Sequence, residues 1–249
     1  EDDYTYKSDY SSTTELLDSI EDLGERMSEE GTVLLKNNGA LPLTKDETQK
    51  VTFLGFSSYF PIQGGDFGSS LVENKGTDAD TVDMVQAFEA KGYSLNPMVQ
   101  NMYESMKEDF KSEAVLPWGV VTYYRATSPA VGGTFTSLEP SQEKLDKAEP
   151  AWKESMNDYN VMVVTIARAA GENTNYTPGE DGVNPDQDLN QADPLGLSDT
   201  ERATIDAAVK AKEENGGKVI VLLNNASAME IDELKNNDGI DAMLEIGIP

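Results

Sequence analysis

The stretch Asn160–Thr177, NVMVVTIARAAGENTNYT, decides the fold of this chain. Within it, Val161–Ala167 is a continuous apolar run, rich in β-branched residues and bounded by polar sequence. That pattern is typical of a strand buried on both faces, and such strands belong to parallel sheets covered by helices. Ligands of open α/β sheets bind just outside the carboxyl ends of the strands. The polar residues that follow, from Arg168 onward, are therefore predicted to face a crevice.

Further apolar runs extend the same sheet. Strands are predicted at Val51–Phe56, at Tyr93–Asn96 near a sheet edge, at Lys218–Asn224, and from Ala242 to Ile246. Amphipathic helices are predicted between them, at 81–91, 98–110, 141–158 with a break at Pro150, 198–216 and 227–236. Ser198 and Glu201 have the spacing of a capping box at the start of the fourth. This alternation predicts an α/β fold, a mostly parallel sheet sandwiched between helices, as in a truncated flavodoxin-like α/β sandwich.

The N-terminal part has a different character. Residues 1–11 are acidic, rich in Tyr and Ser and without a period, which predicts a strap or linker ahead of one domain over 12–249. Ser12 or Thr13 can cap a helix to about Glu30, whose apolar positions recur at three- and four-residue steps. TVLLKNNGALPL, after that helix, is the pattern of a small hairpin, and residues 112–140 predict an irregular excursion. Its aromatic residues could stack on a ligand or fill the core beneath a loop.

Composition bounds the class of protein. The chain has 249 residues, of which 38% are hydrophobic, so it can build a globular core. No apolar run approaches the roughly 18 residues of a membrane helix. The start, EDDYTY, leads us to expect that any signal segment was removed or lies outside this sequence. A formal charge of −27 argues against nucleic acid or anionic membranes as partners and suits a neutral ligand, although it can also serve solubility alone.

The chain contains neither Cys nor His. This excludes disulfides, Cys-based metal sites, Cys nucleophiles, and triads or zinc sites that depend on His. Acid–base chemistry must therefore fall to carboxylates, Tyr or Lys. The compartment stays open, because large secreted domains can also lack disulfides.

Several phrases resemble one known family. Glu29–Leu43, EEGTVLLKNNGALPL, followed by the strand VTFLGF, resembles the opening of the α/β-sandwich domain of glycoside hydrolase family 3, which includes β-glucosidases and β-xylosidases. The resemblance continues through R-x-x-GE at Arg168–Glu172, L-x-L-S-x-x-E at Leu195–Glu201, and KVIVLLNNASAMEI at Lys218–Ile231. It covers the chain from about residue 12 to 249 in unbroken order.

The resemblance implies a division of chemistry. Retaining glycosidases need two carboxyl groups about 5–5.5 Å apart, a nucleophile and an acid/base. In this family the nucleophile is an Asp on a separate (β/α)8 barrel, which requires about 250 residues of its own. We therefore expect this chain to be a fragment of a longer β-glucosidase-like enzyme, with the barrel as its partner and no cofactor. Glu172 matches the acid/base position of members that place it on the sandwich.

The same resemblance places a Gly-rich loop, Ser57–Ser70, beside the sugar cleft. We therefore expect Gly64, Gly65 and Asp66 to contact substrate, together with Arg168, which is better suited to orient or ion-pair than to react. GGDFGS matches neither GxGxxG nor GxxxxGK[ST], so nucleotide binding is disfavoured. A plain surface loop remains an alternative.

Other interpretations stay open. One alternative is that Glu172 is a solvated loop acid, one of 46 acids in the chain, and another is that Glu180, close by in sequence, takes its role. The oxygen-rich stretch 181–193 allows calcium but lacks the EF-hand order, and no metal site is predicted. Asn175 and Asn225 begin glycosylation sequons. The whole chain could also be a carbohydrate-binding or supporting module without catalysis, or a flavodoxin-like regulator.

Overall fold

The computed structural model of the chain describes residues 7–44, 49–62, 82–110, 112–116, 119–123, 139–168, 195–225 and 228–248. The chain divides into two compact units, Glu1–Thr32 and Val33–Pro249. The division follows the end of the first helix, because the sheet begins at the residue after Thr32.

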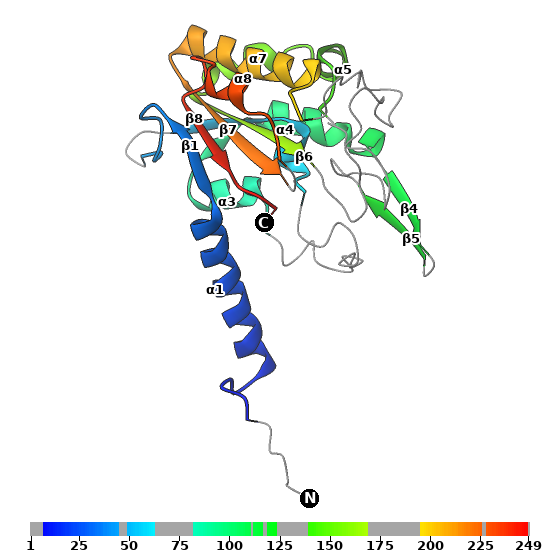
Figure 1. Cartoon of the computed structure of the whole chain (residues 1–249). Helices are drawn as coiled ribbons and strands as arrows, with labels where there is room; N and C mark the ends of the chain where they lie inside the picture. The colour runs from blue at the N-terminus through cyan, green and yellow to red at the C-terminus, as the bar shows by residue number, and fades with distance from the viewer. Residues whose placement is uncertain are drawn as a thin grey trace, which may run out of the picture. The chain divides into compact units, whose positions relative to one another are not determined.

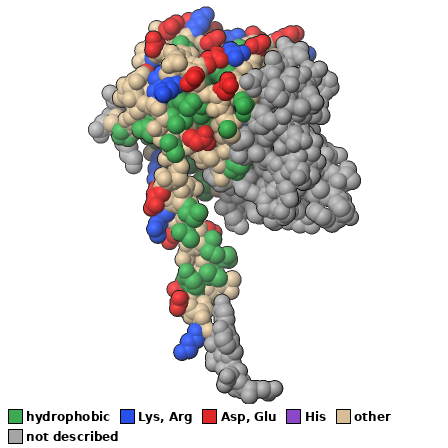
Figure 2. Space-filling view, viewed as in Figure 1, with side chains coloured by type: hydrophobic (Ala, Val, Ile, Leu, Met, Phe, Trp, Pro, Cys, Tyr) green, Lys and Arg blue, Asp and Glu red, His purple; other side chains and the backbone are tan. Residues whose placement is uncertain are grey.

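The first unit contains one helix, α1, at Thr13–Gly31. Its N-cap is Ser12, whose hydroxyl accepts a hydrogen bond from the Glu15 N–H, as the sequence predicted. The apolar positions gather along one side of α1 (Figure 2). They are all exposed: Leu16, Leu17, Ile20, Leu23 and Met27, between 36% and 65%.

The second unit is built around a six-stranded sheet within its described residues. The strands are β1 (Val33–Asn37), β2 (Lys50–Leu54), β3 (Ser94–Leu95), β6 (Val161–Arg168), β7 (Lys218–Asn225) and β8 (Ala242–Glu245). They lie in the order β1-β8-β7-β6-β2-β3, with β1 antiparallel to β8 and all other pairs parallel. Numbered along the chain, the five parallel strands therefore follow the flavodoxin-like order 2-1-3-4-5, which confirms the predicted fold class.

The central strand β6 sits where its composition requires. All eight of its residues are buried, and it pairs in register with β7 from Val161 opposite Lys218 to Arg168 opposite Asn225. β-branched side chains on both of its faces pack against helices on either side of the sheet. The predicted edge strand is also confirmed, since β3 forms one end of the sheet.

Helices cover both faces of the sheet (Figure 1). The larger core joins one face to α4 (Pro97–Ser105), α5 (Gln142–Ala148), α6 (Trp152–Ser155), α7 (Asp199–Asn215) and α8 (Asp232–Lys235). The smaller core joins the other face to α3 (Met84–Ala90) and to the apolar residues Leu41 and Leu43. The break predicted at Pro150 separates α5 from α6.

Three local predictions were wrong. Residues 32–43 do not form a hairpin, because β1 pairs with β8, and the Asn37 side chain instead accepts hydrogen bonds from the N–H groups of Gly39 and Leu41. Part of the segment predicted to be irregular forms an antiparallel pair, β4 (Ser112–Leu116) and β5 (Gly119–Tyr123). The helix predicted at 227–236 is reduced to the single turn α8. The partner of β1 lies far along the chain, and the pairing of β4 with β5 orders a segment that has no clear period of its own.

Within the described ranges, no helix combines the length and the apolar character that a bilayer crossing demands.

Candidate functional site

The strand order marks one place on the sheet edge as the candidate site. The chain leaves β2 toward β3 on one side, whereas β6 continues to β7 on the other. In doubly wound sheets the connections diverge at such a switch point, and a ligand crevice opens outside the carboxyl ends of the two strands. These ends are Leu54 in β2 and Arg168 in β6. The candidate site is therefore the carboxyl edge between β2 and β6.

The turn after β2 packs directly on β6. Gly55 has a φ of 91°, and a Cβ built there would lie 2.3 Å from the Thr165 carbonyl oxygen. Only glycine fits both this left-handed conformation and this close approach. The Gly55 N–H donates to the Tyr103 hydroxyl at 3.0 Å, and the Ser58 hydroxyl donates to the Thr165 hydroxyl at 2.7 Å. The start of the Gly-rich segment is thereby fixed to the central strand.

A buried carboxylate, Glu139, secures the same turn from the other side. It accepts hydrogen bonds from the Phe56 N–H at 2.8 Å, the Tyr103 hydroxyl at 2.9 Å and the Thr204 hydroxyl at 2.7 Å. Burial, together with a smaller effect of the nearby charge of Glu201, raises the pKa of Glu139 to about 7 despite these three donors. Glu139 thus joins α2 (Phe56–Tyr59), α4 and α7 through a group that titrates near neutrality.

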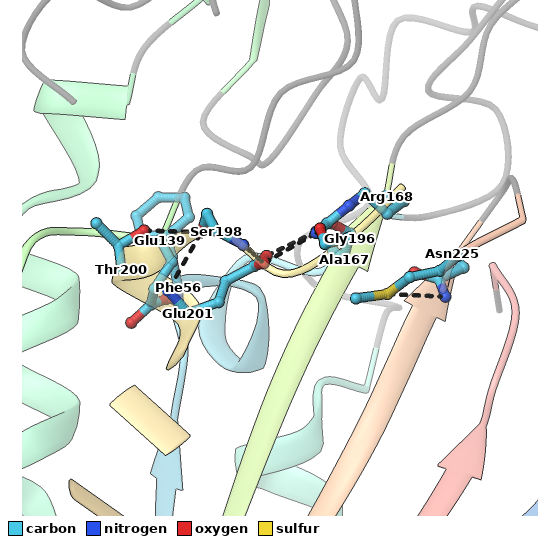
Figure 3. Close-up of polar contacts among 10 residues, drawn as sticks. Phe56, Glu139, Ala167, Arg168, Gly196, Ser198, Thr200, Glu201 and Asn225 are labelled. Atoms are coloured by element: carbon cyan, nitrogen blue, oxygen red, sulfur yellow. Dashed lines mark hydrogen bonds and ion pairs between the residues drawn. The ribbon is translucent and has the colours of Figure 1, made fainter. Parts of the chain in front are cut away.

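Arg168, the last residue of β6, forms a buried ion pair with Glu201 of α7 (Figure 3). Its Nη1 and Nη2 donate to the two carboxylate oxygens at 2.6 Å and 2.9 Å, the paired geometry that a guanidinium and a carboxylate prefer. The two side chains are only 1% and 3% exposed. The pair ties the central strand to the first turn of α7.

The same guanidinium also reaches the chain just before α7. Arg168 Nη2 donates to the Gly196 carbonyl at 2.6 Å, and Glu201 accepts from the Ser198 N–H at 2.9 Å while the Ser198 hydroxyl caps the helix. The predicted capping box is therefore confirmed. These contacts bring the two ends of the 169–194 segment together beside the switch point.

The end of β7 supplies two amides. Asn224 is fully buried; its Oδ1 accepts from the Ile62 N–H at 2.6 Å, and its Nδ2 donates to the carbonyls of Ile62 and Gly247. The Asn225 Nδ2 donates to Glu245 at 3.2 Å, and its side chain is nine-tenths buried, which does not suit a glycosylation acceptor. Asn224 thus anchors Ile62, a residue within the Gly-rich loop Ser57–Ser70.

Among the residues predicted for the site, only Arg168 lies in the described ranges. Gly64, Gly65 and Asp66 fall in 63–81, and Glu172 and its competitor Glu180 fall in 169–194, outside the described residues. Their roles remain predictions. Arg168 forms a buried ion pair, as expected of an arginine better suited to orient or ion-pair than to react. Its contact with substrate stays a prediction.

Sequence reasoning missed two residues that support this edge. Glu139 lies between Leu138 and Pro140 in a stretch without a period that would mark it as buried, and Asn224 looked like the end of a buried strand. Glu201 was recognised only as a capping partner. Their contacts are made across the fold, so a local pattern cannot reveal them.

No cluster of three or more acidic side chains able to hold a metal ion occurs among the residues that the structure describes. The oxygen-rich stretch 181–193 lies outside those residues.

Comparison with known proteins matches most of the chain to one family. The model of the glycosyl hydrolase family 3 C-terminal domain matches residues 32–249. A search of curated proteins found no match.

Solved structures share the fold. β-Glucosidase 3B from Thermotoga neapolitana, in complex with glucose, is 23% identical over 94% of this chain and 27% of its own, with a TM-score of 0.64. β-Glucosidase from Listeria innocua, in complex with isofagomine, is 14% identical over 97% of this chain and 25% of its own, with a TM-score of 0.50. The present chain thus spans about a quarter of the length of these proteins.

Proposed function

Because the chain belongs to the family of the glycosyl hydrolase family 3 C-terminal domain, we propose that it forms the α/β-sandwich part of a retaining β-glycosidase that hydrolyses terminal β-linked sugars. The observation that carries the proposal is the position of β6. Its carboxyl end lies at the switch point of the sheet, and the R-x-x-GE phrase begins at its last residue, Arg168. A carboxyl group four residues beyond that end is well placed to enter a crevice at this edge.

Glu172 is the proposed acid/base. A general acid must reach the glycosidic oxygen within about 2.6–3.2 Å, and its pKa must be raised so that it holds a proton near neutral pH. Glu139, at the described edge of the sheet, offers a precedent, because burial raises the pKa of its carboxyl to about 7. Gly64, Gly65 and Asp66 are proposed to contact the sugar, because their segment leaves the anchored turn beside β6. No cofactor is required by this chemistry.

The nucleophile is proposed to come from a (β/α)8 barrel of the same polypeptide. The similar β-glucosidases are nearly four times as long as the matched part, since the present chain covers 27% of the Thermotoga protein. A barrel of about 250 residues fits within that remainder. On this proposal the present chain, alone, has no hydrolytic activity.

A non-catalytic role is the second candidate. The anchored turn at Gly55 and the buried contacts around Arg168 hold this edge of the sheet in shape, and such an edge would serve equally well to bind a sugar or to support a partner domain without chemistry. The two candidates differ in whether Glu172 is needed for turnover.

The test uses the parent enzyme and an aryl β-glucoside. We expect Glu172→Gln to lower kcat by about 10²–10⁴-fold, the contribution of a general acid–base. Glu180→Gln, a matched change eight residues away, is expected to keep most of the activity. Azide is a nucleophile that needs no general base. With an activated substrate, azide should therefore restore turnover by Glu172→Gln, and the product should be a β-glycosyl azide. Normal turnover by this variant would contradict the assignment and favour the non-catalytic role.

A further inference from the structure

We propose that Glu201 and Arg168 act as a positioning pair for the general acid, by holding together the two ends of the segment that carries Glu172. This inference rests on the proposed function, since it takes Glu172 as the acid/base. The pair itself is seen directly (Figure 3).

The geometry of the pair is specific. Two parallel N–H···O contacts, at 2.6 Å and 2.9 Å, fix the guanidinium in the plane of the Glu201 carboxylate. Both side chains are nearly fully buried, so water cannot replace these contacts without opening the core. The Arg168 side chain is therefore confined to one orientation.

The position of the pair in the chain gives it a role beyond holding β6 to α7. Arg168 is the last residue before the segment 169–194, and it donates both to Glu201 and to the Gly196 carbonyl just after that segment. The Gly196 side is held independently, because the Leu195 carbonyl accepts from the Glu230 N–H at 2.9 Å. One guanidinium thus fixes the distance between the entry and the exit of the segment.

Glu172 follows Arg168 by four positions in the chain, with three residues between them. On the proposed function, we expect a displacement of the entry to move Glu172 as well, because the two residues are close in sequence, and a misplacement of about 1 Å can cost about 10²-fold in rate. Such a loss has a distinct signature. A general acid matters most when the leaving group is a poor one, and an activated nitrophenolate departs without protonation.

The experiment compares two substrates in the parent enzyme: a dinitrophenyl β-glucoside and an alkyl β-glucoside. For Glu201→Gln, which keeps the side-chain shape but removes the charge, we expect kcat/KM to fall by about 30–100-fold on the alkyl glucoside. On the dinitrophenyl glucoside it should fall by less than about threefold. Glu233→Gln is the matched control, because Glu233 of α8 forms a half-exposed ion pair with Arg202, the residue next to Glu201 in α7. With this variant both substrates should react as in the wild type.

Equal losses on both substrates, or none, would overturn the positioning role. If Glu201→Gln does not fold, Arg168→Lys provides the second measurement, since it keeps the charges but removes the paired geometry. Glu172→Gln in the same assay separates the two proposals. If that variant shows no dependence on the leaving group, the proposed function fails; if it does and Glu201→Gln and Arg168→Lys do not, only the positioning role fails.

Discussion

At the scale of single residues, Glu139 makes stability depend on pH. Its pKa is raised from 4.5 to about 7 by burial, so between these values the folded state binds more protons than the unfolded chain, and stability falls as pH rises. A shift of this size corresponds to about 3 kcal/mol. We therefore predict that the stability of the wild type relative to Glu139→Gln decreases by about 3 kcal/mol from pH 4.5 to pH 7.5. Urea unfolding of both proteins across this range measures the difference.

The control is Glu143→Gln, on the exposed first turn of α5 close to Glu139 in sequence. Its stability difference from the wild type should stay within about 0.5 kcal/mol at every pH. A Glu139→Gln difference that is constant with pH would show that Glu139 does not titrate in this window.

At the scale of elements, the turn from β2 into α2 depends on one glycine. Gly55→Ala should destabilise the fold by about 3 kcal/mol or more, because a Cβ at a φ of 91° is strained and also meets the Thr165 carbonyl of β6. Gly216, at the C-cap of α7, also has a positive φ, 71°, but its added Cβ would meet nothing within 4 Å. Gly216→Ala should therefore cost only about 1 kcal/mol. Chemical denaturation of both variants measures their losses in unfolding free energy. The difference between the two losses reports the close approach of Gly55 to β6, and equal losses would contradict a role for that contact.

At the scale of the whole molecule, the net charge of −27 opposes folding by self-repulsion. Acidic and basic side chains are interspersed over the part of the surface drawn in colour (Figure 2). Salt therefore screens attraction between opposite charges as well as repulsion between like charges. Since carboxylates outnumber cations by 46 to 19, repulsion dominates. We predict that the Tm rises as sodium chloride increases from about 0.02 M to about 0.5 M, where the Debye length falls well below 10 Å. Calorimetry tests this prediction in sodium chloride, because sulfate would stabilise the fold by its exclusion from the protein surface. A falling Tm would show that attraction within ion pairs outweighs repulsion between like charges.

Much of the fold could be predicted from local patterns. The buried run at β6, the capping box at Ser198 and the edge position of β3 all depend on residues close in sequence, and the structure confirms them. The hairpin at 32–43 failed because the partner of β1 is β8, about two hundred residues away. No local pattern distinguishes a strand that pairs with its neighbour from one that pairs with a distant strand.

For the candidate site, the sequence by itself determined the types of chemistry: without Cys or His, proton transfer falls to carboxylates, Tyr or Lys, and the residue after the apolar run Val161–Ala167 is an arginine. Only the tertiary structure decided that this arginine is buried against Glu201, that Glu139 holds the neighbouring turn, and that β2 and β6 form the switch point. The reason is physical. Residue types and their spacing fix which groups are available, whereas burial, strand order and the partners of a charge arise only when distant segments pack together.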